Sequence, residues 1–173
     1  TNPDTIREIK RTMRFEKVSD AVRRVNESEN VHQHLDLIAG LPHEDYKSFG
    51  KSFDDVYRLE PKQLQLGFLK VLKGSYMEAQ KETYGLLYQS TPPYEVLRTK
   101  WLSYDDIIRL KQIEEMVEVY YNSRQFMHTI AALGEVFDSP FALYEKLAGY
   151  YEKNGLLSVS HGRAARYEIL LDY

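Results

Sequence analysis

A carboxylate, Asp36, lies within the apolar segment His34–Glu44, which has the sequence HLDLIAGLPHE. The apolar run ends at Gly40 and Pro42, and an acidic pair then opens an amphipathic segment. A strand that stops at Gly and Pro before a helix is typical of the βα unit of a parallel sheet. Ligands of α/β proteins bind at the carboxyl ends of such strands. Asp36 is therefore the first candidate site residue, because a buried carboxylate needs a polar partner or a ligand.

Two other groups of polar residues have weaker claims to a site. His32 and His34 face the same side of the predicted strand, but no third ligand follows at a recognisable spacing, so we predict no metal site. Lys70, Lys73 and Lys81 would suit a phosphate, yet lysines at this density are more often a solvated strand end. The chain has no P-loop, dinucleotide-binding glycine pattern or nucleophile elbow.

The composition is that of a globular protein. The chain has 173 residues, 43% of them hydrophobic and 28% charged, enough for one large domain or two small ones. The net charge of −3 gives no general reason to expect nucleic acid or an anionic membrane as a partner. The absence of cysteine excludes disulfides, thiol nucleophiles and thiolate-ligated clusters from this chain, and we expect a reducing, cytoplasmic compartment. No apolar run approaches ~20 residues, so we expect no membrane span.

The first 75 residues are predicted to run helix, helix, strand, helix, strand. Asn2 and Pro3 are typical of a helix start, and Ser19 or Asp20 would open the second helix. Apolar spacing predicts helices at 3–12, 18–28 and 45–59 and strands at 32–39 and 63–72. The strands are far enough apart for a right-handed parallel crossover, but two strands do not make a stable parallel sheet. We therefore expect the missing strands upstream, in a longer protein, or in a partner.

The pattern after residue 75 is mainly helical. Ser103 is predicted to cap the strongest helix, and Gly155 to end another in the left-handed conformation. The tyrosine pairs 120–121 and 150–151 should each place one ring inward and one outward. In the tail, 156–173, apolar and polar residues alternate weakly, and this pattern predicts a short hairpin around His161. Helices are predicted at 76–87, 103–121, 123–135 and 139–153.

The tail also suggests the wing of a winged helix, because Arg163 and Arg166 lie within it. Neither the charge nor the spacing requires that interpretation. A base-stacking role for the tyrosine pairs is likewise less favoured than a tyrosine-rich core or docking face. We therefore do not expect nucleic-acid binding.

Three motifs in order resemble the last third of a radical SAM barrel. They are IKR at 9–11, DLIAGLPHED at 36–45 and LQLGFLKVLKGS at 64–75. The resemblance is to the oxygen-independent coproporphyrinogen oxidases and the cobalamin-binding radical SAM proteins. It covers residues 1–75, while 76–173 resembles the uncharacterised helical domain that follows such barrels in some cobalamin-binding members.

The resemblance implies site residues for S-adenosylmethionine. Arg11 matches the arginine that faces the methionyl carboxylate, and a guanidinium can hold a carboxylate with two hydrogen bonds. Asp36 matches the residue that contacts the ribose hydroxyls. Ile38 and Gly40 match the hydrophobic and glycine positions beside the adenine, where glycine lets the backbone approach a flat ring. Lys70 matches a strand residue whose backbone contacts the adenine.

The chain departs from the family pattern in two places. His43 replaces the usual glycine after GLP, so the turn can differ. The Cys-x3-Cys-x2-Cys loop that binds the [4Fe–4S] cluster is absent, because in the family it lies upstream of the region matched here. Without those thiolates this chain alone is expected to be inactive.

The resemblance leads to two hypotheses. The first is an α/β fold at 1–75, the last βα units of a partial barrel, followed by a mostly α-helical domain at 76–173. The full-length protein would then be a radical SAM enzyme that uses S-adenosylmethionine, an iron–sulfur cluster and, with a suitable N-terminal domain, cobalamin. Its partners would be the missing half of the barrel or a second copy paired through the exposed sheet edge. The second is a non-catalytic helical interaction module on an α/β stub.

Overall fold

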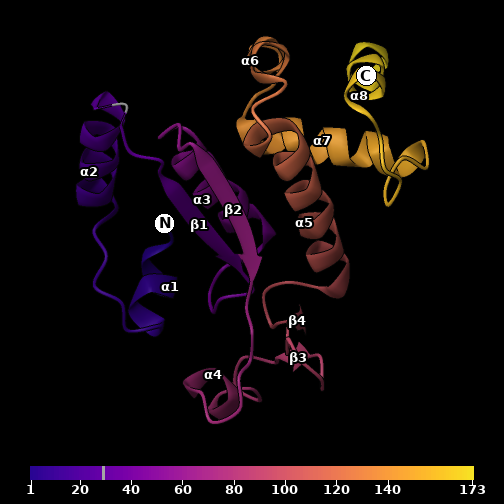
Figure 1. The fold of residues 1–173 in the computed structure, drawn as a ribbon. Coiled ribbons are helices and arrows are strands. Elements are labelled where there is room, and N and C mark those ends of the chain that lie inside the picture. Colours follow the sequence, from indigo (N-terminus) through magenta and orange to yellow (C-terminus); the bar gives the residue numbers. More distant parts are fainter. Residues whose placement is uncertain (29) are drawn as a thin grey trace. The chain divides into compact units, whose positions relative to one another are not determined.

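The chain folds into an α/β segment followed by a mostly helical region (Figure 1). A computed structural model describes residues 1–28 and 30–173. It divides into two compact units, Thr1–Leu110 and Lys111–Tyr173, and the boundary falls within helix α5 (Tyr104–Val117). The elements before α5 are α1 (Pro3–Glu8), α2 (Phe15–Glu27), β1 (His34–Ala39), α3 (Tyr46–Tyr57), β2 (Gln63–Phe68), α4 (Tyr76–Ala79), β3 (Leu87–Tyr88) and β4 (Val96–Arg98).

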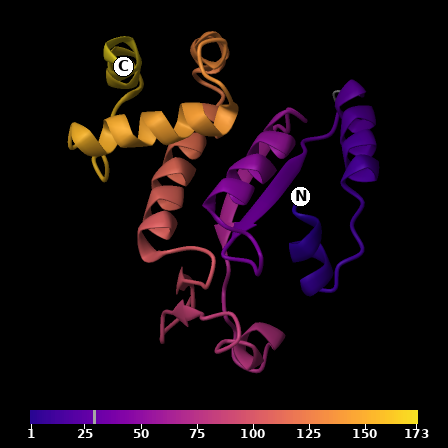
Figure 2. The same ribbon diagram turned by 180° about the vertical axis from the view of Figure 1, so that it is seen from behind.

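β1 and β2 form the predicted parallel pair, with Leu37 opposite Leu66. Helix α3 connects the two strands and lies against one face of the sheet, as the view from behind shows (Figure 2). Phe49 and Phe53 of α3 are completely buried. Alternate strand residues are buried on the α3 side, namely Leu37, Ala39, Leu64, Leu66 and Phe68. The core of the first unit therefore lies between α3 and this face.

The first helix starts as predicted but ends early. The Asn2 side chain accepts a hydrogen bond from the Asp4 amide at 3.0 Å, and Pro3 occupies the first helical position. The helix stops at Glu8 rather than at residue 12, because Lys10 adopts φ +55° and the Arg11 amide reaches back to the Ile6 carbonyl at 3.0 Å. This bonding closes the helix end in a Schellman motif.

Helix α2 begins four residues before the predicted cap. Ser19 lies inside the helix, where its hydroxyl donates to the Phe15 carbonyl at 2.9 Å. Neither Ser19 nor Asp20 is the cap, because the cap position is occupied by Arg14, whose side chain makes no capping hydrogen bond. Val22 faces inward and sets the buried side of the helix.

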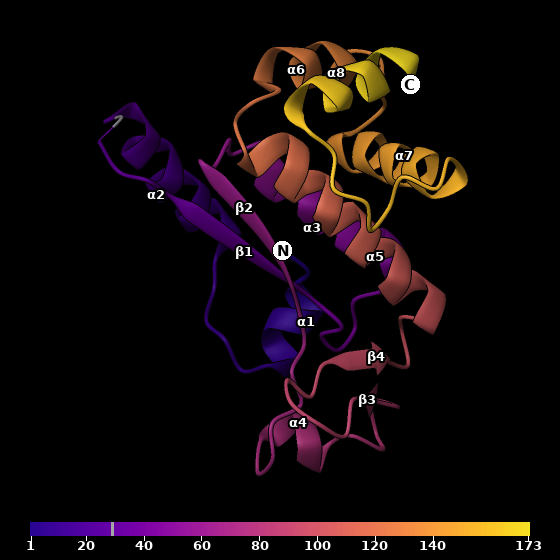
Figure 3. The ribbon, with the colours of Figure 1, turned by 45° about the vertical axis from the view of Figure 1, so that its right-hand side comes forward.

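Residues 69–98 were predicted incorrectly in part. The predicted helix 76–87 is only the single turn α4, because the backbone leaves the helical conformation at Gln80. Gly85 then turns the chain at φ +59°. The Pro-rich break beyond it connects β3 and β4, an antiparallel pair that lies past the end of β2 (Figure 3). The Leu69 amide donates to the Ala39 carbonyl at 2.9 Å, and the Val96 amide donates to Leu69 at 2.8 Å. Backbone pairing thus continues from β1 through residue 69 to β4.

The second unit contains the remaining helices, and one tyrosine pair departs from prediction. Tyr120 and Tyr121 are both buried, because they lie in a π-helical turn whose i→i+5 bonding breaks the 3.6-residue period. Tyr151 is buried and Tyr150 partly exposed, as predicted. The elements after α5 are the π-helix Glu118–Asn122, α6 (Met127–Gly134), α7 (Pro140–Lys153) and α8 (Arg163–Asp172).

The predicted C-terminal hairpin is wrong, since the tail contains helix α8. Ala164, Ala165 and Leu170 are strong helix formers, and this local preference outweighs the weak alternation. The wing hypothesis fails with the hairpin on which it depended. Among the helices that residues 1–28 and 30–173 form, none combines the length and apolar character needed to cross a bilayer.

Candidate functional site

The sheet face opposite α3 carries the strand residues predicted to touch a ligand. Asp36 and Ile38 are exposed on this face, and Gln65 lies beside Asp36 in the register. The expectation that Asp36 is a buried carboxylate is therefore wrong. Alternation along the strand turns its side chain away from α3 and toward the uncovered side.

Arg11 and Lys70, the two predicted basic site residues, are exposed side chains. Arg11 follows α1 and uses its backbone amide to end that helix. Lys70 forms an isolated antiparallel bridge with Glu95. Within the described part of the chain, no hydrogen bond or ion pair joins Arg11, Asp36 and Lys70 to one another, so the structure does not gather them into one cluster.

Gly40 has a structural role that needs no ligand. Its φ is +91°, and a Cβ atom at this position would lie 2.7 Å from Cγ1 of Val96. The space that a side chain would need is already filled by β4. Gly67, next to Ile38 in the register, is less constrained, since a Cβ there would meet only the Leu37 carbonyl oxygen at 3.6 Å.

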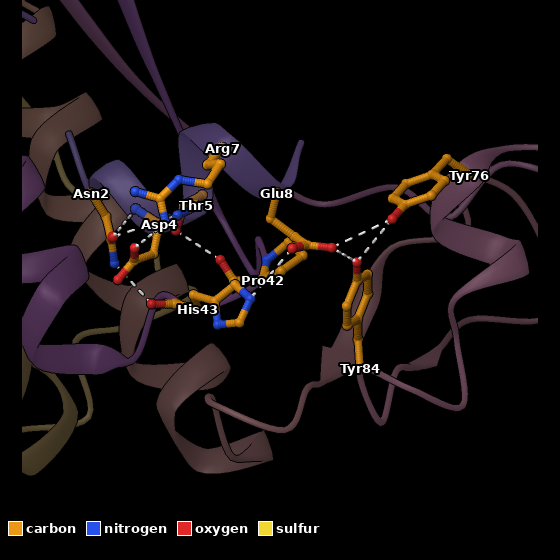
Figure 4. A network of polar contacts seen from close by, with 9 residues as sticks. All are labelled: Asn2, Asp4, Thr5, Arg7, Glu8, Pro42, His43, Tyr76 and Tyr84. Atoms are coloured by element: carbon orange, nitrogen blue, oxygen red, sulfur yellow. Dashed lines mark hydrogen bonds and ion pairs between the residues drawn. The ribbon is translucent and has the colours of Figure 1, made fainter. Parts of the chain in front are cut away.

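A polar and aromatic cluster lies at the carboxyl end of β1 (Figure 4). The Glu8 carboxylate accepts a hydrogen bond from the Tyr84 hydroxyl and a longer one, at 3.4 Å, from the Tyr76 hydroxyl. Nε2 of His43 lies 3.7 Å from the same carboxylate. We call Glu8, His43, Tyr76, Tyr84 and Trp101 the strand-end cluster.

Helix α1 fixes the loop that carries His43. The Asn2 side chain donates to the His43 carbonyl at 2.8 Å, and the Thr5 hydroxyl donates to the Pro42 carbonyl at 2.7 Å. His43 adopts φ +63°, the left-handed conformation in which glycine is favoured. His43 therefore places a bulky side chain in a turn of the type that favours glycine.

Trp101 adds an aromatic surface to the strand-end cluster. Its ring centroid lies 4.8 Å from that of His43 and 5.8 Å from that of Tyr84. The Thr99 hydroxyl accepts the Trp101 amide at 3.0 Å and the Leu102 amide at 2.9 Å. This turn, anchored by a buried threonine, holds the indole in place.

The electrostatics keep Glu8 ionised and Tyr84 protonated. The hydrogen bond from Tyr84 lowers the pKa of Glu8, and the nearby His43 lowers it further. Burial raises the pKa of Tyr84 well above its ordinary value, and the bond to Glu8 adds to the rise. Glu8 therefore faces His43 as an anion, and the two side chains form an ion pair whenever the imidazole is protonated.

Glu44, beside His43, is a buried carboxyl that sequence analysis did not select. It is 5% exposed and accepts a hydrogen bond from the Ser52 hydroxyl at 2.8 Å. Burial raises its pKa. The following residue, Asp45, caps α3 by accepting from the Ser48 amide at 2.8 Å. The acidic pair therefore belongs to the packing of α3, and Glu44 is directed inward.

No metal site forms within the described residues. Across residues 1–28 and 30–173, no three His, Cys, Asp or Glu side chains lie close enough together to hold an ion. The ring centroids of His32 and His34 lie 4.7 Å apart. Since the chain also has no cysteine, its donor set does not fit an iron–sulfur cluster.

Sequence reasoning missed the strand-end cluster because its members come from four separate segments. One signal was present: a histidine in a position that favours glycine. The contact of Glu8 with Tyr84 joins residues far apart in the sequence, so no spacing could reveal it.

One known family overlaps this region. A family model described as "Protein of unknown function (DUF4080)" matches residues 82–173, slightly more than half of the chain. The match begins two residues before Tyr84 and includes Trp101, so part of the strand-end cluster lies within it. No curated protein matches the chain.

Proposed function

This chain belongs to the DUF4080 family, and we propose that it is the C-terminal part of a radical SAM enzyme. The observation that carries the proposal is the one-sided parallel pair β1–β2. Parallel strands are normally covered on both faces and apolar on both, whereas here the face opposite α3 presents Asp36 and Gln65. A polar inner face is what a barrel needs when its interior holds a polar ligand.

The order of the three motifs supports the same proposal. The strand predicted from DLIAGLP and the strand predicted from LQLGFLKVL are parallel neighbours joined by α3. The radical SAM resemblance also implied an uncharacterised domain after residue 75, and the match to a family of unknown function begins at residue 82.

We assign roles to the predicted residues under this proposal. Asp36 would accept hydrogen bonds from the ribose hydroxyls of S-adenosylmethionine, and Ile38 would pack beside its adenine. Arg11 would hold the methionyl carboxylate, which requires its exposed side chain to reach the sheet in the full-length protein. Gly40 and Lys70 would contribute backbone surface.

The iron–sulfur cluster must be bound elsewhere in the full-length protein. When bound there, it would supply the electron that cleaves S-adenosylmethionine to a 5′-deoxyadenosyl radical. Residues of this chain would bind and orient the nucleoside part. With cobalamin also bound, the reaction on the substrate would be a methyl transfer or a rearrangement.

The partner of this chain would be the missing half of the barrel. Among the described strands, β1 pairs with β2 along one edge, while residue 69 beyond β2 pairs with β4. The other edge of β1 is thus the place for an upstream strand, or for a second copy of the chain when that strand is lacking.

A second candidate is a non-catalytic interaction module. It is favoured by exposed apolar side chains on the second unit, where Val136 is 80% exposed and Leu171 86%. Docking through the tyrosine pairs themselves is excluded for Tyr120 and Tyr121, because both are buried. The docking surface would instead be formed by these aliphatic residues.

The coding sequence upstream of Thr1 separates the two candidates. The radical SAM proposal requires a Cys-x3-Cys-x2-Cys loop in an earlier βα unit of the same polypeptide. Its presence would support the enzyme, and a complete upstream sequence without it would refute the enzyme and leave the interaction module.

A further inference from the structure

The loop that follows β1 is attached to α1 at two places with different chemistry. At the start of α1, Asn2 and Thr5 donate to the carbonyls of His43 and Pro42. At its end, Glu8 lies 3.7 Å from Nε2 of His43. The first attachment uses an amide and a hydroxyl that do not titrate near neutral pH. The second is an ion pair only when the imidazole carries a proton.

We propose that Glu8 and His43 form a proton-operated clamp between α1 and the loop after β1. With His43 protonated, the ion pair adds a second point of attachment. With His43 neutral, the Coulomb attraction to Glu8 is lost, and the loop is held less firmly at the carboxyl end of β1. The inference concerns the regulation of this loop and holds whether or not the radical SAM proposal is correct.

The surroundings of the pair make Glu8 a fixed partner. Tyr84 and Tyr76 both donate to its carboxylate, so the anion is held in place before His43 gains its proton. The other charged groups nearby are engaged with partners other than His43: Asp4 with Arg7 at 3.1 Å, Lys10 over the Tyr76 ring at 5.1 Å, Glu44 and the Thr1 amine with Ser52, and Asp45 with the Ser48 amide. Glu8 is therefore the group whose interaction with His43 changes when His43 gains a proton.

The size of the effect follows from exposure. The side chains of His43 and Glu8 are 43% and 34% exposed, so water screens the pair. Ion pairs of this kind couple by a factor of about two to five in an equilibrium constant. The clamp therefore adjusts the loop rather than locking it.

A double-mutant cycle on the 173-residue chain tests the clamp. Glu8→Gln, His43→Gln and the double variant are unfolded in urea at pH 5.5 and pH 8.0, followed by the fluorescence of Trp101, the chain's single tryptophan. We expect the two sites to be coupled by a factor of about two to five at pH 5.5 and to be coupled more weakly at pH 8.0.

The matched control is the pair Asp20 and Arg23 on α2, whose charged atoms lie 3.6 Å apart and are also exposed. This pair contains no histidine, and aspartate and arginine side chains ordinarily keep their charges between pH 5.5 and 8.0. The cycle of Asp20→Asn and Arg23→Gln should therefore give the same coupling at both values. Equal coupling of Glu8 and His43 at both pH values, or none at pH 5.5, would overturn the clamp.

The native fluorescence of Trp101 gives a second measurement that does not depend on unfolding. A protonated imidazole quenches a neighbouring indole, and the two rings are 4.8 Å apart. The emission of the wild-type chain should fall between pH 8 and pH 5, and His43→Gln should abolish the fall. A fall that persists in His43→Gln would mean that another group titrates beside the indole and that the clamp is wrong.

Discussion

At the scale of single residues, Gly40 has less room for a side chain than the other described glycines. Its φ of +91° lies in the left-handed region, and a Cβ atom added there would lie 2.7 Å from Cγ1 of Val96. Both features disfavour any side chain at this position. The family resemblance implied that a ligand approaches the backbone at Gly40. The structure shows that a side chain from β4 already makes that approach.

Substituting Gly40 should therefore destabilise the first unit even without ligand. We expect Gly40→Ala to lower the free energy of unfolding by roughly 2–4 kcal/mol, from backbone strain and overpacking. Urea unfolding followed by Trp101 fluorescence would measure the loss. Gly67→Ala is the control, since its Cβ meets only an ordinary contact at 3.6 Å. Equal losses at the two glycines would contradict this account.

Glu8 gives a pH dependence with a defined sign. Its pKa is lowered in the folded chain, chiefly by Tyr84, so its charge stabilises the fold above the unfolded-state pKa. That stability is lost as the pH falls through the folded pKa. Glu8→Gln should thus be less stable than wild type at pH 7, and the difference should shrink below about pH 4. A difference that stays constant from pH 3 to pH 7 would show that the carboxylate's charge plays no part.

At the scale of elements, the sequence predicted those helices and strands that depend on apolar spacing and capping residues within a short segment. The parallel strands, α3 and the capped start of α5 followed from apolar spacing, from Asp45 and from Ser103. The end of α1 depended on Lys10 adopting a left-handed φ, which is uncommon outside glycine. The hairpin β3–β4 depends on pairing with residue 69, a contact across the fold that no short window contains.

The start of α5 offers a direct test at this scale. The Ser103 hydroxyl accepts the Asp106 amide at 3.1 Å, and the Asp106 carboxylate accepts the Ser103 amide at 2.9 Å. Ser103→Ala should lower the free energy of unfolding by about 0.5–2 kcal/mol. Ser90→Ala, an exposed serine in the β3–β4 connection, should leave it nearly unchanged. No loss at Ser103 would mean that this cap is dispensable.

At the scale of the whole molecule, the family match and the compact units divide the chain differently. The match begins at residue 82, whereas the first unit extends to Leu110. Residues 82–110 therefore belong both to the matched family region and to the first compact unit. They contact the α/β segment through the hydrogen bond from Tyr84 to Glu8 and through Val96, which lies beside Gly40. The site residues show the same limit of sequence reasoning: Asp36 and Ile38 were predicted from the family resemblance, but the strand-end cluster could be recognised only in the folded chain.

The isolated chain should bind S-adenosylmethionine weakly. Each hydrogen bond that Arg11 or Asp36 could offer contributes only about 0.5–1.5 kcal/mol, against an association cost of several kcal/mol. We expect a Kd no tighter than roughly millimolar in titration calorimetry. A micromolar Kd that Asp36→Ala abolishes would show that the protein's own contacts are stronger than this reasoning allows.

The central claim, that this family member completes a radical SAM barrel, is tested most directly by one assay of the full-length protein. The polypeptide is reconstituted anaerobically with iron and sulfide, reduced with dithionite and incubated with S-adenosylmethionine, and 5′-deoxyadenosine is measured by chromatography. We predict that it forms, and that Asp36→Ala slows its formation while Lys73→Ala does not. Absence of 5′-deoxyadenosine from protein that carries a reduced cluster would contradict the claim.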